Sequence, residues 1–263
     1  DAIAAEPKHY VGYGNPVGGL NCAPCTMGRH DVFSDCLPVF EAAFRDGGAV
    51  DAMCSYNSID SIPVSMDHEL LTDVLRGQYG MRGFVRTDLT AVSRLYDWHF
   101  IAPTPEEAIR LGVEAGVDLQ LYDFPHDVWQ DSLQHLVESG RMDVSVVDTA
   151  CRRVLRVKFM LGLFEHPYTD EHRAETVLRC PDHLELARRI ARESVVLLKN
   201  DDLLPLRKDL DCIAVIGPGA DEAALGDYSE ARGRTGQVTV LDGIKAAVSP
   251  KTKVLHARGC NFL

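Results

Sequence analysis

The sequence predicts an α/β protein: a partial (β/α)₈ TIM-like barrel, its C-terminal half, followed by the start of an α/β sandwich domain. Three apolar runs predict barrel strands, at residues 49–56, 83–89 and 117–121. They begin about 33 residues apart, which is the length of one βα unit. Helical patterns fill the intervals between them, and alternating strands and helices favour a parallel sheet. A closed barrel needs about 250 residues, so the roughly four units present here predict half of one.

The intervening helices are predicted by their apolar spacing and by capping residues. The run Thr104-Pro105-Glu106-Glu107 places an N-cap threonine before a proline at the first helical position and a glutamate at the third. Residues 67–78 carry leucine and valine at helical spacing. Residues 145–161 form an amphipathic pattern. We therefore expect helices at all three places.

The second part of the chain predicts another α/β domain. Residues 1–165 are assigned to the C-terminal half of the barrel domain, 166–180 to a polar linker, and 181–263 to the start of the second domain. Within the last of these, we expect a helix over 182–199, a strand over 212–216, a helix over 239–248 and a strand over 253–257.

Composition excludes several classes of function. The 263 residues carry a net charge of −12, which argues against nucleic acid as a partner because phosphate binding needs a basic face. The sequence contains no apolar run of about 18 residues, so no membrane span is predicted. Cys22 and Cys25 have the spacing of a redox motif or half a zinc site, but no second pair accompanies them. We expect no metal and no cofactor.

Asp88 is the strongest candidate for chemistry, because it lies at the C-terminal end of a predicted barrel strand. Active sites of such barrels lie on that face. There a carboxylate can act as a nucleophile, a base or a metal ligand, while the structural alternative is an N-cap for the following helix. Lys8 and His9 end the first strand-like run and could hold hydroxyl groups. A Schiff-base role for Lys8 is a further alternative.

Met53 and Tyr56 close the strand at 49–56. Tyrosine offers an apolar face and a hydroxyl group, which suits sugar binding, whereas core packing is the alternative for Met53. The run Gly217-Pro218-Gly219-Ala220-Asp221 follows a strand but lacks both nucleotide-binding patterns, which favours a plain turn.

Taken together, these segments resemble glycoside hydrolase family 3, the β-glucosidase and β-xylosidase group. The matching stretches follow the family order: KHYVGYGNPVGGLN, LPVFEAAF, MCSYNSID, LLTDVLRGQYGMRGFVRTDLTAV, EAGVDLQL, ACRRVLRVKFMLGLFEHPY, ARESVVLLKNDDLLPL and IAVIGPGADE. Leu89 departs from the pattern, since the family usually has an aromatic residue after the nucleophile.

The resemblance implies a retaining β-glycosidase that removes terminal β-linked glucose or xylose. It places the nucleophile on Asp88 and the sugar-holding pair on Lys8 and His9, and it puts Met53 and Tyr56 in the same pocket. It implies a carbohydrate substrate, with no nucleic acid or membrane partner. We expect the first barrel segment and a C-terminal segment bearing the acid/base Glu to lie outside this chain. Both are needed for a complete site.

Three alternatives stay open. An N-acetylhexosaminidase on the same scaffold would carry Asp and His soon after the Lys-His motif, and residues 15–21 contain neither. A lyase would use Lys8, and a non-catalytic piece would bind sugar or a protein partner without turnover. The first residues, DAIAAEPKHY, show no signal peptide, so the compartment is left open. A secreted or periplasmic location would suit the full-length protein.

Overall fold

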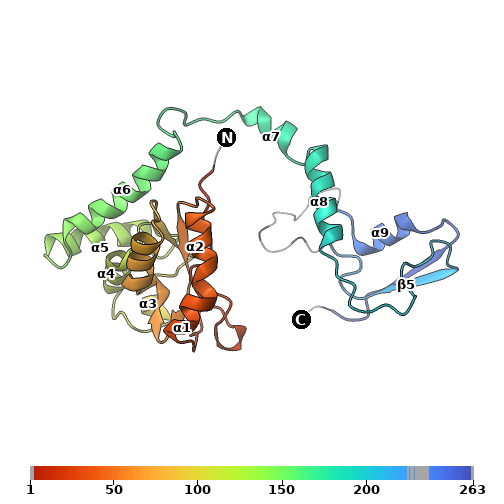
Figure 1. Ribbon diagram of the computed structural model, residues 1–263, viewed down its shortest axis with the longest axis horizontal. Coiled ribbons are helices and arrows are strands. Elements are labelled where there is room, and N and C mark those ends of the chain that lie inside the picture. The colour runs from red at the N-terminus through yellow and green to blue at the C-terminus, as the bar shows by residue number, and fades with distance from the viewer. Residues whose placement is uncertain (1–2, 224, 226–227, 229–236, 262–263) are drawn as a thin grey trace. The chain divides into compact units, whose positions relative to one another are not determined.

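The computed structural model describes residues 3–223, 225, 228 and 237–261. It divides the chain into two compact units, Asp1–Glu171 and His172–Leu263 (Figure 1). The domain boundaries expected from the sequence, at 165 and 181, stay a prediction.

The first unit contains short strands and many helices. In chain order these are η1 (Val17–Gly19), α1 (Arg29–Asp31), η2 (Val32–Cys36), α2 (Leu37–Arg45), β1 (Ala52–Cys54), β2 (Ser58–Ile59), β3 (Ile62–Pro63), η3 (Val64–Met66), η4 (Glu69–Gln78), β4 (Val85–Thr87), α3 (Arg94–Asp97), α4 (Pro105–Ala115), α5 (His126–Glu138) and α6 (Val144–Met160). Helix α7 (Glu171–Val177) begins at the boundary between the units.

Four backbone segments of the first unit lie side by side in parallel. Tyr10 bridges to Cys54 of β1, β1 pairs with β4 with Cys54 opposite Thr87, and Arg86 of β4 bridges to Leu119. The spatial order therefore follows the chain order, as in consecutive strands of a (β/α)₈ barrel. The predicted α/β class and the partial barrel are confirmed.

The predicted strand at 117–121 is reduced to one bridge at Leu119. The peptide N–H of Leu119 donates to Val85 O at 3.2 Å, and Leu119 O accepts from the N–H of Thr87 at 3.1 Å. Two residues later the regular ladder stops, because the N–H of Leu121 donates to the side-chain hydroxyl of Thr87 at 2.7 Å. A side chain has replaced the backbone acceptor, so the strand ends earlier than its apolar pattern indicates.

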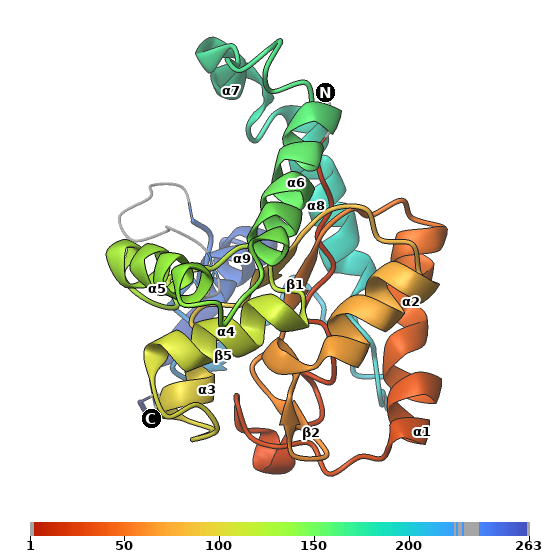
Figure 2. The same ribbon diagram turned by 90° about the vertical axis from the view of Figure 1, so that its left-hand side faces the viewer.

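Helices cover the outer face of these strands, and their packing follows the apolar spacing of the sequence. Helix η4, a wide helix of the π type, buries Leu70, Leu71, Val74 and Leu75. The predicted cap of α4 is confirmed, because the N–H of Glu107 donates to the hydroxyl of Thr104 at 3.2 Å. Helices α5 and α6 both contact α4 (Figure 2).

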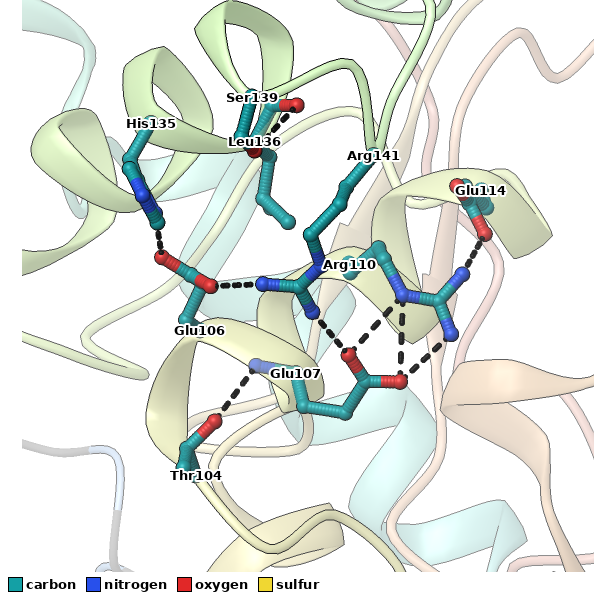
Figure 3. A network of polar contacts seen from close by, with 9 residues as sticks. All are labelled: Thr104, Glu106, Glu107, Arg110, Glu114, His135, Leu136, Ser139 and Arg141. Carbon is teal, nitrogen blue, oxygen red and sulfur yellow. Dashed lines mark hydrogen bonds and ion pairs between the residues drawn. The ribbon is translucent and has the colours of Figure 1, made fainter.

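A polar network joins α4 to α5 and to the turn after α5 (Figure 3). Glu106 accepts from His135 Nδ1 at 2.6 Å and also pairs with Arg141. Arg141 reaches Glu107 as well, at 2.8 Å, and Glu107 pairs with Arg110 within α4 at 2.6 Å. These side chains are partly exposed, so the network fixes orientation more than it adds stability.

The second unit contains α8 (Pro181–Glu193), β5 (Cys212–Ile216), α9 (Val240–Ala247) and β6 (Lys253–Ala257). Strands β5 and β6 pair in parallel, and Leu241 of α9 packs with Val215 and Val254. Both predicted strands are confirmed, and so is the helix between them, which Thr239 caps by accepting from Asp242 N at 3.1 Å.

Two details of this region differ from the predictions. Helix α8 begins at Pro181 and ends at Glu193, whereas the sequence predicted 182–199. Proline suits the first helical position, and the β-branched pair Val195-Val196 follows the observed end. The segment expected to be a linker contains α7, whose polar sequence is nonetheless rich in good helix formers.

Asp51 gives the first unit a pH-dependent contribution to stability. Its side chain is 3% exposed and accepts from the N–H of Phe84 at 3.1 Å. Burial raises the pKa of Asp51 to about 6. Between its ordinary pKa near 4 and pH 6, the folded state holds a proton that the unfolded state has lost. Asp51 therefore lowers stability increasingly as the pH rises through this window.

We expect Asp51→Asn to be more stable than the wild type at pH 7 by about 3 kcal/mol, and equal to it near pH 4, since the shift is about two pKa units and one unit corresponds to 1.36 kcal/mol. Urea unfolding followed by tryptophan fluorescence measures this, because both tryptophans lie in the first unit. Asp46→Asn, an exposed site with the same charge change, is the control. A stability difference between Asp51→Asn and the wild type that does not change with pH would contradict the assignment of this effect to the Asp51 carboxyl group.

Candidate active site

Asp88 follows β4 directly, and the backbone of the neighbouring strand fixes its position. Its N–H donates to Cys54 O at 3.1 Å, and its carboxylate Oδ1 accepts from the N–H of Leu89 at 2.8 Å. The residue is 7% exposed. The alternative interpretation as an N-cap is wrong, because the next helix begins only at Arg94. Asp88 is thus a nearly buried carboxylate at the C-terminal end of a barrel strand.

His9 lies against this carboxylate. Its Nε2 is 3.2 Å from Asp88 Oδ2, and its ring stacks on Tyr13 with 4.0 Å between centroids. Burial lowers the pKa of His9 below its ordinary value; the charge of Asp88 opposes that shift, and the charge of Lys8 adds to it. At neutral pH the imidazole is therefore uncharged, and with its proton on Nε2 it donates to the carboxylate.

Tyr56 approaches Asp88 from the loop after β1. Burial raises the pKa of Tyr56, and the charge of Asp88 and a hydrogen bond with Asp88 raise it further. The phenol therefore keeps its proton and serves as a donor. Met53 is 5% exposed and is paired in register with Arg86. Because side chains alternate along a strand, Met53 lies on the same face as Arg86 and Asp88.

Lys8 is exposed and lines a cavity of about 320 Å³ beside His9, together with Tyr13, Asp35 and Phe40. The structure therefore gathers His9, Tyr56 and Asp88 at the ends of three neighbouring segments. Met53 lies below them on the strand, and Lys8 stands at the edge of the adjoining cavity.

Asp123 is a buried carboxylate that the sequence did not single out, and it is 6% exposed. It accepts four hydrogen bonds, from Val92 N (2.5 Å), Ser93 N (3.1 Å), Thr87 Oγ1 (2.6 Å) and Leu121 N (3.2 Å). Burial raises the pKa of Asp123, and these bonds oppose the shift. Asp123 thus holds the residues on either side of Asp88. Its sequence context, an aspartate between Tyr122 and Phe124, carries no signal of this role.

The segment after α3 also contributes to the site. His99 Nε2 lies 2.9 Å from Tyr56 O, and the indole N–H of Trp98 donates to Cys22 O at 3.1 Å. These contacts attach residues 98–99 to the loops that carry Tyr56 and Cys22. Cys22 and Cys25 are free thiols, and Cys25 is buried, donating to Gly12 O at 3.4 Å. The pair therefore acts as part of the loop packing.

Within the residues that the structure describes, no group of three or more His, Cys, Asp or Glu side chains is placed to hold a metal ion. No helix in the same part of the chain is long and apolar enough to cross a membrane.

Comparisons with known families match both units. The profile of the glycosyl hydrolase family 3 N terminal domain matches residues 1–157, and that of the glycosyl hydrolase family 3 C-terminal domain matches residues 195–258. Both profiles describe one group of glycoside hydrolases. The chain belongs to glycoside hydrolase family 3.

Individual relatives agree with this assignment. The chain is 36% identical to a periplasmic beta-glucosidase of Salmonella typhimurium over 99% of its own length and 34% of that protein. It is 34% identical to a beta-xylosidase of Formosa agariphila, over 99% of this chain and 38% of the relative. The chain therefore spans about a third of the length of these relatives.

Solved structures give the same result. A β-glucosidase from Erythrobacter marinus has a TM-score of 0.90 at 37% identity, over 98% of this chain and 34% of that one. A beta-glucosidase from Listeria innocua in complex with glucose has a TM-score of 0.86 at 32% identity, over 97% and 35%.

Proposed function

We propose that this chain provides the nucleophile half of a retaining β-glycosidase and that Asp88 is the nucleophile. The observation that carries the proposal is the placement of the Asp88 carboxylate. It is nearly buried at the C-terminal end of β4, with His9 Nε2 at 3.2 Å and Tyr56 as a second donor. Two donors on one carboxylate fix its orientation, which a nucleophile requires.

In this mechanism the Asp88 carboxylate attacks the anomeric carbon, the bond to the leaving oxygen breaks, and a glycosyl-enzyme forms. A second carboxyl group, about 5 to 5.5 Å away in retaining enzymes, protonates the leaving oxygen and then activates water. We assign that second role to no residue of this chain. Lys8 and His9 would hold hydroxyl groups of the sugar, with Met53 and Tyr56 lining the same pocket. The chemistry requires only carboxylates and water.

The substrate class we propose is a terminal β-linked glucose or xylose. It is supported by the names of the relatives, which are a periplasmic beta-glucosidase and a beta-xylosidase. It is also supported by the similar Listeria innocua beta-glucosidase, which was solved with glucose. Glucose and xylose differ by the hydroxymethyl group at C5, so a comparison of the two sugars tests the finer assignment.

The proposal is tested by trapping the covalent intermediate. A 2-fluoro β-glucoside with a dinitrophenolate leaving group removes the need for acid assistance and slows hydrolysis of the intermediate. After tryptic digestion, the label should lie on the peptide 87–94, which is bounded by Arg86 and Arg94 and contains Asp88 as its one carboxylate side chain.

Asp60→Asn, at an exposed turn, should label like the wild type, whereas Asp88→Asn should not label. A label on another peptide would overturn the assignment of Asp88. The non-catalytic alternative would be supported if glucose bound saturably but neither the glucose analogue nor the xylose analogue left a label.

Tyr56→Phe should lower kcat by about 10- to 100-fold with little change in KM. The variant keeps the ring but loses a hydrogen bond to a charged group, which contributes about 1.5 to 3 kcal/mol. Steady-state kinetics of a protein that carries the complete site, with an aryl β-glucoside as substrate, measures both constants. Tyr168→Phe, which removes the hydroxyl of a tyrosine that is 92% exposed, is the matched control. If Tyr56→Phe also behaved like the wild type, Tyr56 would have no role in orienting Asp88.

A further inference from the structure

A second cavity lies at the opposite end of β4 from Asp88. Its volume is about 390 Å³, and it is formed by η4, the turn before β4 and α6. Five of its lining residues are arginines, and the full lining consists of Arg76, Met81, Arg82, Thr149, Arg152, Arg153 and Arg156. Arg82 lies six positions before Asp88, so at about 3.3 Å per extended residue the two ends lie roughly 20 Å apart.

The positive charge of this cavity is only partly compensated. Asp118 pairs with Arg76 at 2.5 Å and with Arg153 at 2.9 Å, and Asp148 pairs with Arg152 at 3.2 Å. Among these paired groups and the cavity lining, five guanidinium groups face two carboxylates. The whole chain, in contrast, has a net charge of −12. A concentrated positive charge in an acidic protein attracts anions to one place.

The hydrogen bonding of Arg76 also indicates that the cavity attracts an anion. Its side chain is 11% exposed, and in the described part of the chain its Nε atom is buried without a hydrogen-bond partner. Burial lowers the pKa of Arg76 to about 10; Asp118 opposes the shift, and the charges of Arg153 and Arg156 reinforce it. A buried donor without a partner is costly, and an anion in the cavity would relieve the repulsion among the arginines.

Backbone carbonyls hold two of the cavity's arginines in place. Arg156 Nη1 donates to Arg82 O at 2.8 Å, and Arg76 Nη1 donates to Gly83 O at 2.8 Å. These bonds join α6 and η4 to the start of β4. The guanidinium groups of Arg76 and Arg156 are therefore positioned before any ligand arrives, which reduces the entropy cost of binding.

We propose that this cavity binds a phosphate group, either as free phosphate or on a small phosphate monoester. Guanidinium groups match phosphate oxygens in bidentate geometry. The volume exceeds what one phosphate fills and lies within the range of small-molecule sites, so it leaves room for an organic part. The proposal is independent of the role of Asp88, because the two sites share no residue.

Isothermal titration tests the proposal with sodium phosphate and, separately, with glycerol phosphate, each at an ionic strength held constant with sodium chloride. The test variant is Arg82→Gln combined with Arg152→Gln, because both side chains are exposed and neither contacts Asp118. Arg192→Gln is the control: Arg192 has the same 67% side-chain exposure as Arg152 and the same 3.2 Å ion-pair distance.

We expect saturable binding that the double variant weakens at least tenfold and the control leaves unchanged. Tighter binding of glycerol phosphate than of phosphate would identify a monoester as the ligand, and the reverse would identify free phosphate. The proposal is overturned if neither anion binds above the chloride background, or if the double variant binds as the wild type does. Circular dichroism of each variant ensures that folded proteins are compared.

Discussion

In a protein that carries the complete site, replacement of Asp88 by alanine should reduce kcat on aryl β-glucosides by on the order of 10⁴-fold or more, the scale of loss in enzymes deprived of their nucleophile. The Asp88 carboxylate sits between the His9 imidazole and the Tyr56 phenol, and no water molecule in its place would attack with comparable strength. The folded structure should persist, because the backbone bond from Asp88 N to Cys54 O does not need the side chain.

A small external anion distinguishes a lost nucleophile from a damaged fold. In Asp88→Ala, azide can occupy the space of the missing carboxylate and attack a substrate that has an activated leaving group. The attack comes from the side that Asp88 occupied, so a β-glucoside should yield the α-glucosyl azide, which proton NMR identifies. The β-azide would instead indicate that the removed residue was the acid/base, and wild-type kinetics would exclude Asp88 from the chemistry.

Several features of the fold followed from local sequence patterns. The capping run at Thr104 and the helical pattern over 239–248 each predict a helix, and Thr104 and Thr239 both accept a capping hydrogen bond at the start of one. Strand β5 has the bounds its apolar run predicted. These features depend on neighbouring residues alone, so a single sequence contains the information. Asp88 was found because a strand end in a barrel defines the face where active sites lie.

Other features depend on contacts between distant segments, which no local pattern contains. Asp123 meets Thr87 and Val92 across more than 30 positions of sequence, and its own surroundings look like an ordinary turn. The shortening of the last predicted strand has the same origin, because the hydroxyl of Thr87 takes the N–H of Leu121. The arginine cavity likewise assembles from η4, the turn before β4 and α6, and the acidic net charge of the chain conceals it.

The second large effect concerns stability and centres on Asp118. Its side chain is 1% exposed, and it accepts from Arg76 at 2.5 Å, from Arg153 at 2.9 Å and from the N–H of Val85 at 2.8 Å. One carboxylate thus joins η4, α6 and β4. We expect Asp118→Asn to lower the free energy of unfolding by about 3 to 5 kcal/mol, because removal of one partner leaves buried charge without compensation. Urea unfolding followed by tryptophan fluorescence measures the change in the first unit.

Asp148→Asn is the matched control, because it removes the same charge from the same cavity region. Asp148 is 53% exposed and pairs with Arg152 at 3.2 Å, and exposed pairs contribute about 1 kcal/mol or less. Equal losses in the two variants would mean that burial of Asp118 does not determine the effect.

Asp118→Asn also leaves Arg76 and Arg153 facing the cavity without their shared carboxylate. If the cavity holds phosphate, unfolding in phosphate buffer should recover more stability for Asp118→Asn than for the wild type, since a ligand that binds only the folded state stabilises it more the tighter it binds.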